Sequence, residues 1–175
     1  MAGKDINIID IHIREFIPEK NQEDHNVLLP AFLAIWNAPE NLRFLSFTQI
    51  PFKEPTVVGW FSNHQNLGGH YYAATEKDNS EISGIAAVRI NLIEGFEIIG
   101  IGVRPESKRQ GIATKLIEHT LFVAKDHNFK AVEAGVLTDN VAMLRLLLSM
   151  SFVPVRMDYN RRCDGQDTLH MKKIL

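Results

Sequence analysis

The sequence lacks several features that mark particular classes of protein. It contains one cysteine, Cys163, which excludes an internal disulfide and any zinc site made from several cysteines. It begins without a long apolar segment, and no stretch approaches the length of a membrane span, so we expect a soluble, cytoplasmic protein. The formal net charge is −2, and no basic run is longer than Arg161-Arg162 or Lys172-Lys173, so we expect no binding of nucleic acid.

Motifs of nucleotide and metal chemistry are also missing. Neither the phosphate loop G-x-x-x-x-G-K-[ST] nor the dinucleotide motif G-x-G-x-x-G occurs. The seven histidines form no H-x-x-x-H or H-E-x-x-H pair, so the sequence predicts no catalytic metal. Cys163 follows Arg162 in a predicted hairpin, and nothing beside it indicates an activated nucleophile.

What the sequence does contain is a strand, a basic turn and a helix in direct succession. Residues 96–103 read F-E-I-I-G-I-G-V, a short apolar and β-branched run that is typical of a buried strand. Apolar residues then recur at helical spacing from Arg109 to about His127. Pro105 keeps this helix from reaching back into the strand, because the residue before a proline disfavours the α region.

The turn between strand and helix has the properties of an anion site. The first N–H groups of a helix have no partner within it, and the helix dipole leaves partial positive charge there. Gly111 has no Cβ to obstruct a phosphate, and Ala113 adds only a methyl group. Lys108 and Arg109 add positive charge. A solvated loop with two surface cations fits the same residues, and spacing alone does not decide between the two interpretations.

The same turn resembles the acetyl-CoA signature of the GNAT superfamily of N-acetyltransferases, [R/Q]-x-x-G-x-[G/A] after a strand that ends in V-x-P. The six matching positions, with Lys where the family prefers Arg or Gln, are Lys108, Arg109, Gln110, Gly111, Ile112 and Ala113. A second segment, 138–152, resembles the family's N-x-x-A…L-Y-x-x-x-G-F helix, with Asn140 as its first residue. The resemblance covers residues 80 to 155, and the two motifs together are more specific than either alone.

Periodicity along the rest of the chain predicts the remaining elements. Apolar alternation and turn residues predict strands at 6–16, 70–77, 81–93, 96–103, 129–137, 152–161 and 166–174. Helical spacing predicts helices at 23–37, 39–47, 109–127 and 139–150. Residues 56–64 fit a short helix or an apolar strand, and we favour the helix. Asp139 is the expected N-cap of the last helix.

These elements predict an α/β (α+β) fold. We expect a single-domain, GNAT-like mixed sheet of about seven strands, mostly antiparallel, with helices on both faces. The strand at 129–137 should lie parallel to that at 96–103, because strand, helix and strand form a right-handed crossover. Within one domain over 1–175 we expect acceptor-side helices and first strands (1–80), an acetyl-CoA-binding core (81–155) and a C-terminal hairpin (156–175).

The resemblance also implies a place for each part of acetyl-CoA, the expected co-substrate. It implies that the sheet splays between its fourth and fifth strands and that the pantothenoyl arm pairs with the backbone of Ile101, Gly102 and Val103. It implies that residues 109–114, from Arg109 to Thr114, hold the pyrophosphate, and that Asn140 contacts the arm.

Glycines and aromatic residues near the expected split leave alternatives open. Gly100, Gly102 and Gly135 either make room for the thioester or allow close strand packing or a bulge. The aromatic residues of the first helices either wall an acceptor pocket or belong to the core. They are Trp36, Phe44, Phe47, Phe52, Trp60 and Phe61.

Acetyl transfer to an amine requires a proton acceptor. An amine of lysine type has a pKa of about 10.4, so holding it neutral at pH 7 costs roughly 4.6 kcal/mol. Carboxylates or histidines near the start of the central strand often serve as base in the family, and Glu97 has that position. If no bulge intervenes, one face of the strand carries Glu97, Ile99, Ile101 and Val103. A strand-end Glu paired with a cation is the alternative, and Glu133 and Glu94 are weaker candidates.

The sequence departs from the family where a general acid is expected. The family's Tyr position is Leu147 here, and the usual Gly before Phe152 is Ser151. Tyr159 on the following predicted strand is a substitute candidate, although strand tyrosines more often belong to the core. A thiol of pKa about 8.5 is a tolerable leaving group, so loss of the acid need not abolish turnover.

Two functions follow from these residues. The first is an acetyl-CoA-dependent N-acetyltransferase that acylates a primary amine by direct attack, with acetyl-CoA and an amine acceptor as its partners. The second is a CoA-binding or sensing module that has lost turnover, as Leu147 suggests. A nucleotide-phosphate binder is a weaker third reading, and homodimer formation is left open.

Overall fold

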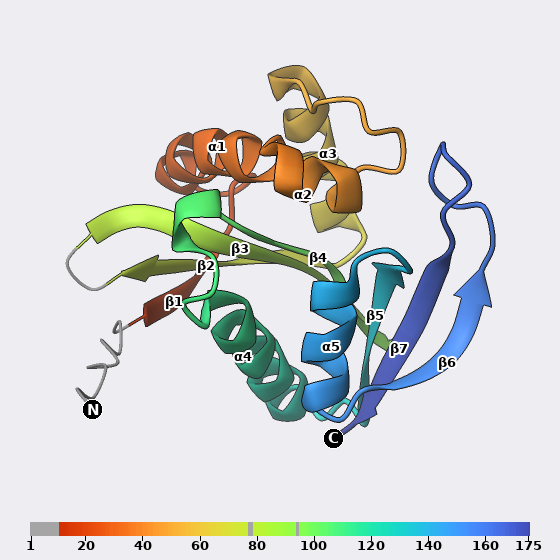
Figure 1. Cartoon of the computed structure of the whole chain (residues 1–175). Coiled ribbons are helices and arrows are strands. Elements are labelled where there is room, and N and C mark those ends of the chain that lie inside the picture. The colour runs from red at the N-terminus through yellow and green to blue at the C-terminus, as the bar shows by residue number, and fades with distance from the viewer. Residues whose placement is uncertain (1–10, 77–78, 94) are drawn as a thin grey trace, which may run out of the picture.

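Helices cover both faces of a central sheet (Figure 1). The computed structural model describes residues 11–76, 79–93 and 95–175. On one face lie helices α1 (Gln22–Trp36), α2 (Pro39–Leu45) and α3 (Glu54–Asn66). On the other lie α4 (Ile112–Asp126) and α5 (Val141–Ser149), and a short 3-10 turn, η1 (Pro105–Ser107), precedes α4.

The sheet has seven strands in the order β1-β2-β3-β4-β5-β7-β6. Their bounds are β1 Ile11–Phe16, β2 Gly69–Glu76, β3 Asn79–Asn91, β4 Gly95–Val103, β5 Ala131–Leu137, β6 Val153–Asp158 and β7 Thr168–Ile174. The β4–β5 pair is parallel and all other pairs are antiparallel. The predicted fold class is confirmed, including the parallel crossover through α4 and the helix over 56–64.

Several predicted boundaries change, and one predicted boundary lies outside the described residues. Helix α4 begins at Ile112 rather than at Arg109, because Arg109 (φ 64°) and Gly111 (φ 81°) are both left-handed. Strand β6 ends at Asp158 and β7 starts at Thr168, so the hairpin loop is longer than the predicted turn. The first part of the predicted strand 6–16, residues 6–10, is outside the described residues, as is Glu94.

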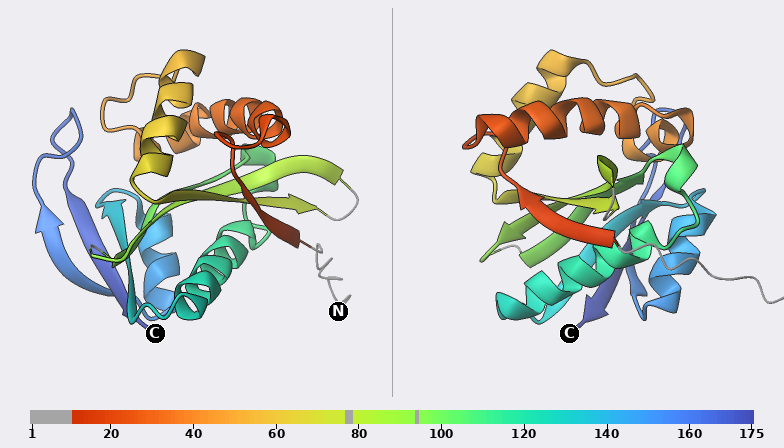
Figure 2. Two further views of the ribbon diagram at one scale, coloured as in Figure 1. Left: turned by 180° about the vertical axis from the view of Figure 1, so that it is seen from behind. Right: turned by 90° about the vertical axis from the view of Figure 1, so that its left-hand side faces the viewer.

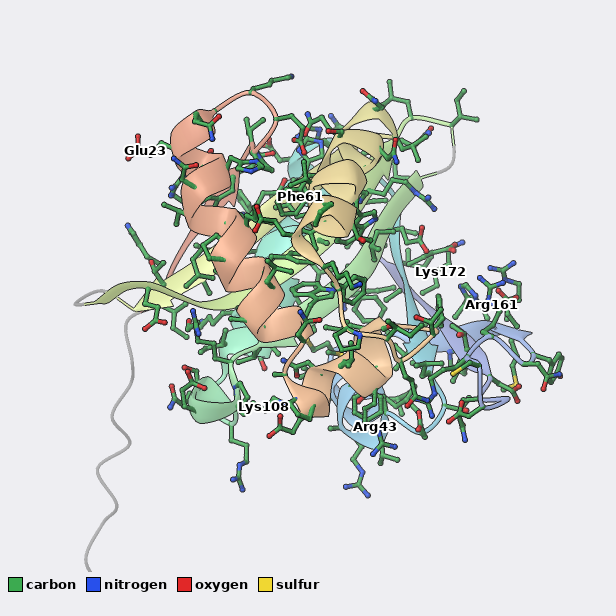
Figure 3. The ribbon with its side chains drawn as sticks, turned by 90° about the horizontal axis from the view of Figure 1, so that it is seen from above. Glu23, Arg43, Phe61, Lys108, Arg161 and Lys172 are labelled. Atoms are coloured by element: carbon green, nitrogen blue, oxygen red, sulfur yellow. The ribbon has the colours of Figure 1, made fainter. Side chains whose placement is uncertain are left out.

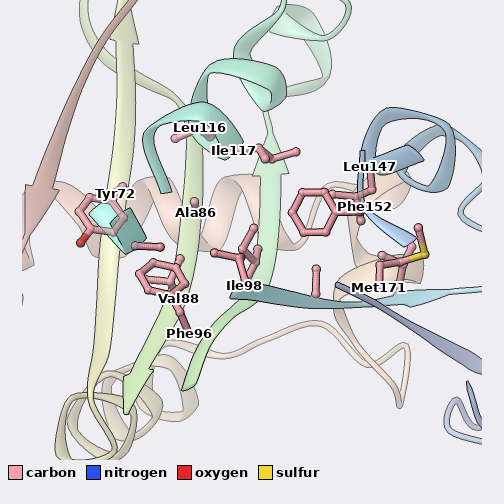
Figure 4. Close-up of a cluster of buried hydrophobic side chains, with 14 of the residues drawn as sticks. Tyr72, Ala86, Val88, Phe96, Ile98, Leu116, Ile117, Leu147, Phe152 and Met171 are labelled. Carbon is pink, nitrogen blue, oxygen red and sulfur yellow. The ribbon is translucent and has the colours of Figure 1, made fainter. Parts of the chain in front are cut away.

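The core consists of two clusters, one on each face of the sheet. The cluster under α4 and α5 joins the strands to Leu116, Leu147 and Phe152, all of which are buried. Figure 4 shows Leu147 beside Phe152 in this cluster. The cluster under α1–α3 contains Trp36 and Phe61. The core interpretation therefore holds for these two aromatic residues, because burying such side chains is the main stabilising term in folding.

Strands β4 and β5 part after only three paired residues. The register is Phe96↔Val132, Glu97↔Glu133 and Ile98↔Ala134, and no pair follows between them. Beyond that point β4 stays paired with β3 as far as Val103, and β5 stays paired with β7. The sheet therefore opens like a V at this parallel pair, as the GNAT resemblance implies.

A bulge in β4 lies at the same level. Ala87 of β3 pairs with Gly100 and Val88 pairs with Ile98, so Ile99 is the extra residue. The bulge reverses the alternation of side chains along the strand. Glu97 lies on the α1–α3 face with Ile99, whereas Ile101 packs on the α4–α5 side. The expectation of one shared face for Glu97 and Ile101 is therefore wrong.

Helix α5 ends in a strained residue. The N–H of Phe152 donates to Leu147 O (3.0 Å) and that of Ser151 donates to Leu148 O (3.0 Å), which is a Schellman motif. Ser151 has φ 67°, the left-handed conformation in which glycine has no Cβ penalty. The family's glycine at this position thus has a structural reason.

We predict that Ser151→Gly stabilises the protein by up to about 1 kcal/mol. The left-handed conformation costs a non-glycine residue roughly 1–2 kcal/mol, and the extra freedom of glycine in the unfolded chain offsets part of the gain. A rise in Tm of about 2–4 °C is expected from thermal unfolding. Ser149→Gly, inside the last turn of the same helix, is the matched control and should lower Tm. A lower Tm for Ser151→Gly would refute this account.

Candidate active site

A cleft of about 370 Å³ opens between α2, the η1–α4 turn, β4 and α5. Side chains from four separate stretches of the chain line it. They are Glu40, Asn41, Phe44, Leu45, Ile101, Val103, Ser107, Lys108, Arg109, Gly111, Ile112, Ala113, Thr114, Asn140, Ala142, Met143 and Leu146. The cleft is thus formed where the N-terminus of α4 meets the mouth of the V in the sheet.

The N-terminus of α4 is open to a ligand. Its N-cap is Gly111, which offers no side-chain cap, and the first turn carries no acidic residue. No atom lies within 4 Å of a Cβ built on Gly111, so the space beside it is free. The amides of Ile112, Ala113 and Thr114 precede the first intrahelical bonds and are directed out of the helix end. With Lys108 and Arg109 on the same wall, this end suits an anion.

The cleft continues into the split between the strands. A smaller cavity of about 50 Å³ is lined by β4 and β5 residues that include Ile99, Gly100 and Gly135. Its walls share Ile101 and Asn140 with the larger cleft. One route therefore leads from the α4 N-terminus along β4 to the point where the sheet opens.

Most of the predicted cofactor residues meet in this cleft, and two do not line it. Those that line it are Ile101, Val103, Lys108, Arg109, Gly111, Ile112, Ala113, Thr114 and Asn140. Gly102 packs against α1 instead, since a Cβ there would meet Ile35 Cγ2 at 2.5 Å. The Gln110 side chain is exposed and donates to Glu106 O at 3.4 Å.

Two asparagines fix the walls of the cleft. Asn140 caps α5 by accepting from the Met143 N–H (3.2 Å), and its Nδ2 has no partner among the described residues. Buried Asn41 of α2 donates to Val103 O (2.9 Å) and Ile35 O (2.8 Å). The Val103 carbonyl, one of the β4 groups expected to pair with the pantothenoyl arm, thus already accepts a hydrogen bond from Asn41.

Sequence reasoning missed the contribution of α2 to the cleft. Asn41, Phe44 and Leu45 line it, although this segment was assigned to the acceptor side. Nothing local marks them, because a seven-residue helix with three apolar positions fits any buried surface. Phe47 is 48% exposed, whereas Phe52 and Trp60 pack against the core.

The opposite face of the split carries a row of charges. Arg89, Glu97, Glu133 and Lys172 are successive partners across β3, β4, β5 and β7. Each carboxylate is paired outward, Glu97 with Arg89 and Glu133 with Lys172 (2.7 Å). These residues line a broad groove of about 660 Å³ whose walls come from the strands and the α4–β5 turn. In Figure 3, Lys172 lies on the β6–β7 side, well apart from Lys108.

The candidates for a general acid gain no support from this geometry. Leu147 is buried in the core under α5. Tyr159 follows the end of β6, is 70% exposed and is absent from the lining of the cleft and of the split. Its assignment stays a prediction.

Asp139 is not the N-cap of α5, contrary to expectation. Its carboxylate instead accepts from Arg162 (Nη2–Oδ2 2.7 Å) and Arg43 (2.9 Å), and Arg162 also binds Asp164 (2.8 Å) and Arg43 O (2.7 Å). Arg162 is buried, so its donors need these partners. The cluster ties the β6–β7 loop to α2, and Figure 2 shows that loop rising beside the α2–α3 connection.

These ion pairs set the pKa values of both carboxylates. The hydrogen bond from Arg162 lowers the pKa of Asp164 to about 2. Burial acts to raise the pKa of Asp139, but the hydrogen bonds from Arg162 and Arg43 outweigh it and the pKa is lowered. Both groups are therefore ionised at neutral pH.

Fold and cleft together define a class of architecture, which is a mixed sheet split at one parallel pair with a helix N-terminus suited to an anion at the mouth of the split. Comparison with protein families names the class. The acetyltransferase (GNAT) family matches residues 19–152, so the chain belongs to the GNAT family of N-acetyltransferases, enzymes of the acyltransferase class. Comparison with curated proteins gave no match.

Solved structures share the fold. An N-acetyltransferase from Staphylococcus aureus Mu50 has a TM-score of 0.76 at 20% identity, covering 94% of this chain and 98% of that one. A ribosomal-protein-alanine N-acetyltransferase from Brucella melitensis has a TM-score of 0.74 at 20% identity, covering 94% and 99%. A Salmonella typhimurium protein described as an acetyltransferase, with its cofactor acetyl-CoA, has a TM-score of 0.67 at 18% identity, covering 94% of both chains.

Two features are absent from the described residues 11–76, 79–93 and 95–175. No helix there is both long and apolar enough to cross a membrane. No group of three or more His, Cys, Asp or Glu side chains there is arranged to hold a metal ion.

We predict that acid weakens the attachment of the β6–β7 loop. An unfolded Asp has a pKa near 3.9 and folded Asp164 one of about 2, so its stabilising effect is complete above about pH 4 and is lost as pH falls toward about 2. Arg162→Met removes the partner and should flatten this part of the curve of Tm against pH. The same acid slope in wild type and variant would contradict the assignment.

Proposed function

We propose that this protein is an acetyl-CoA-dependent N-acetyltransferase that transfers acetyl to a primary amine by direct attack. The observation that carries the proposal is the continuity of the α4 anion site with the split between β4 and β5. A pyrophosphate at one end and a thioester at the other need such a route. Acetyl-CoA supplies the activated acetyl group, and the chain positions both substrates and handles the protons.

The residues present fit this co-substrate. Uncapped amides and Lys108 suit the pyrophosphate, and open space at Gly111 lets it approach the backbone. Beyond Ile98 the β5-facing edge of β4 has no strand partner, so an extended arm can pair with it as an added strand. Asn140 Nδ2 remains available as a donor near the arm.

The chemistry on the amine side needs a base. Glu97 is our proposed general base, acting through water, because it lies on the open face near the split. Its pairing with Arg89 is the feature that weighs against it. Glu133, paired with Lys172, is the weaker candidate. Tyr159 stays the proposed acid with no contact to support it, and the thiolate is able to leave unaided near neutral pH.

The division of the chain into acceptor-side, cofactor and hairpin segments remains a proposal. Helix α2, which was placed in the acceptor-side segment, is now added to the residues proposed to wall the cofactor site.

The alternative function, a CoA-binding module with little or no turnover, is favoured by one observation: Leu147 replaces the family's acid and is buried in the core.

We predict that acetyl-CoA and CoA, but not ATP, raise Tm. At 100 times Kd a ligand adds about 2.7 kcal/mol, equivalent to roughly 5–11 °C for a chain of this size. Lys108→Ala should weaken CoA binding about tenfold, because it removes a charge-assisted hydrogen bond.

Lys115→Ala is the matched control for that variant. Lys115 is exposed one turn further along α4, pairs with Glu118 (3.2 Å) and does not line the cleft. A shift with ATP as large as with CoA would instead identify a general nucleotide site. Absence of any shift with CoA and acetyl-CoA would reject the proposed function.

We predict that Glu97→Gln lowers kcat/KM for an amine acceptor by about 10²-fold and leaves the acetyl-CoA thermal shift unchanged. Acceptors to assay are a peptide with an N-terminal alanine, as the Brucella neighbour's name suggests, lysine amide and spermidine. Glu118→Gln, on the far side of α4, controls for a general effect of charge loss. Unchanged turnover in Glu97→Gln would exclude Glu97 as the base.

A further inference from the structure

His170 of β7 lies at the point where the sheet opens. Its register partner is Gly135, the first β5 residue beyond the last β4–β5 pair. A Cβ built on Gly135 would lie 3.7 Å from His170 Cε1 and 3.8 Å from Nδ1, so this edge of the ring covers Gly135. Gly135 in turn lines the cavity within the split. His170 itself lines the groove on the opposite face, so only Gly135 lies between the imidazole and the cavity within the split.

Asp158 of β6 holds this ring in one orientation. His170 Nε2 is 2.9 Å from Asp158 Oδ2, and the hydrogen bond from His170 lowers the pKa of Asp158, which is thus ionised at neutral pH. An ionised carboxylate only accepts, so Nε2 carries the proton and Nδ1, at the Gly135 edge, keeps its lone pair. The His170 side chain is 13% exposed and lines the groove on this face of the split.

The guanidinium of Arg156 also contacts the His170 ring, in a position that does not block the Nδ1 lone pair. Its Nη2 is 3.2 Å from Nδ1 and 3.1 Å from Nε2, and an atom so nearly equidistant from both nitrogens lies over the ring face rather than on a lone pair. Arg156 also lies 3.6 Å from Asp158 Oδ1. The guanidinium therefore packs on the imidazole and restrains it.

Glu97 is placed differently. It pairs with Glu133 in the register, one row before the split, whereas His170 stands opposite Gly135, beyond it. Residues two apart along a strand are about 6.6 Å apart, so the backbone of His170 is nearer to the opening by about that distance. The Glu97 carboxylate is moreover engaged by Arg89.

We propose that His170, oriented by Asp158, is a catalytic base that takes a proton from the acceptor amine at the split, as an alternative to Glu97 in that role. This inference rests on the proposed function and names a residue that the signature motifs do not reach. One ammonium proton passes to His170 Nδ1 and then to solvent. The freed nitrogen pair attacks the thioester carbon, the C–N bond forms, the C–S bond breaks, and the second proton lost by nitrogen ends on the departing sulfur.

The first experiment measures rates with the acceptor amines above. His170→Gln should lower kcat/KM by about 10²-fold or more and change the pH profile of the reaction. Asp158→Asn should have a similar effect, since an amide that donates to Nε2 moves the ring proton to Nδ1. The charged groups facing this ring, Arg156, Asp158, Glu133 and Lys172, are left intact in His170→Gln.

His70→Gln is the matched control. His70 also pairs with a carboxylate, Glu15, but lies on β2, next to the edge strand β1 and away from the split, so its loss should leave kcat/KM and the pH profile unchanged. A wild-type rate and pH profile in His170→Gln would overturn the inference, whatever Glu97→Gln does.

The second experiment needs no acceptor. In ¹⁵N spectra of histidine side chains, His170 should be the Nε2–H tautomer in the wild type and the Nδ1–H tautomer in Asp158→Asn. Acetyl-CoA should shift the Nδ1 resonance of His170 more than CoA does, and leave His70 unchanged. If acetyl-CoA raises Tm but does not shift the Nδ1 resonance of His170, this inference fails and the proposed function stands. If acetyl-CoA does not bind at all, both fail.

Discussion

The divergence of β4 from β5 is the constraint on which the rest of the site depends. A sheet normally leaves few backbone groups unpaired, and here both strands keep full pairing on their outer sides, β4 with β3 and β5 with β7. Only the facing edges beyond Ile98 and Ala134 are released. The bulge at Ile99 bends β4 at this level, as bulges do. The result is an edge able to accept an extended ligand inside an otherwise closed sheet.

Elements distant in sequence hold this opening at a defined width. Asn41 ties α2 to the end of β4, and Arg162 ties the β6–β7 loop to α2 and to the turn before α5. Each is a buried polar side chain whose partners lie far along the chain. Such groups are costly to leave unpaired, so they fix geometry where apolar packing alone would permit sliding. The N-terminus of α4 is consequently presented to one end of the split.

The two faces of the split differ in chemistry. The α4–α5 side offers amides, cations and apolar walls. The other side offers a row of paired charges and the His170–Asp158 pair. The buried Leu147 shows that the α5 side has no acid at the family's usual position. The side chains proposed to handle protons, Glu97 and His170, both line the groove on this open face.

The sequence by itself determined the fold class and the parallel crossover, because strand–turn–helix periodicity is a local signal. The resemblance of its glycine-containing turn to the GNAT signature predicted most of the residues that line the cleft. The sequence also showed Leu147 and Ser151 at positions where the GNAT family has Tyr and Gly. Only the tertiary structure decided that Ile99 is a bulge, that Asp139 pairs with Arg162 instead of capping α5, and that α2 lines the cleft. The same is true of His170 beside Gly135. These are contacts between segments far apart in the chain, where register and packing, and no local pattern, set which side chains meet.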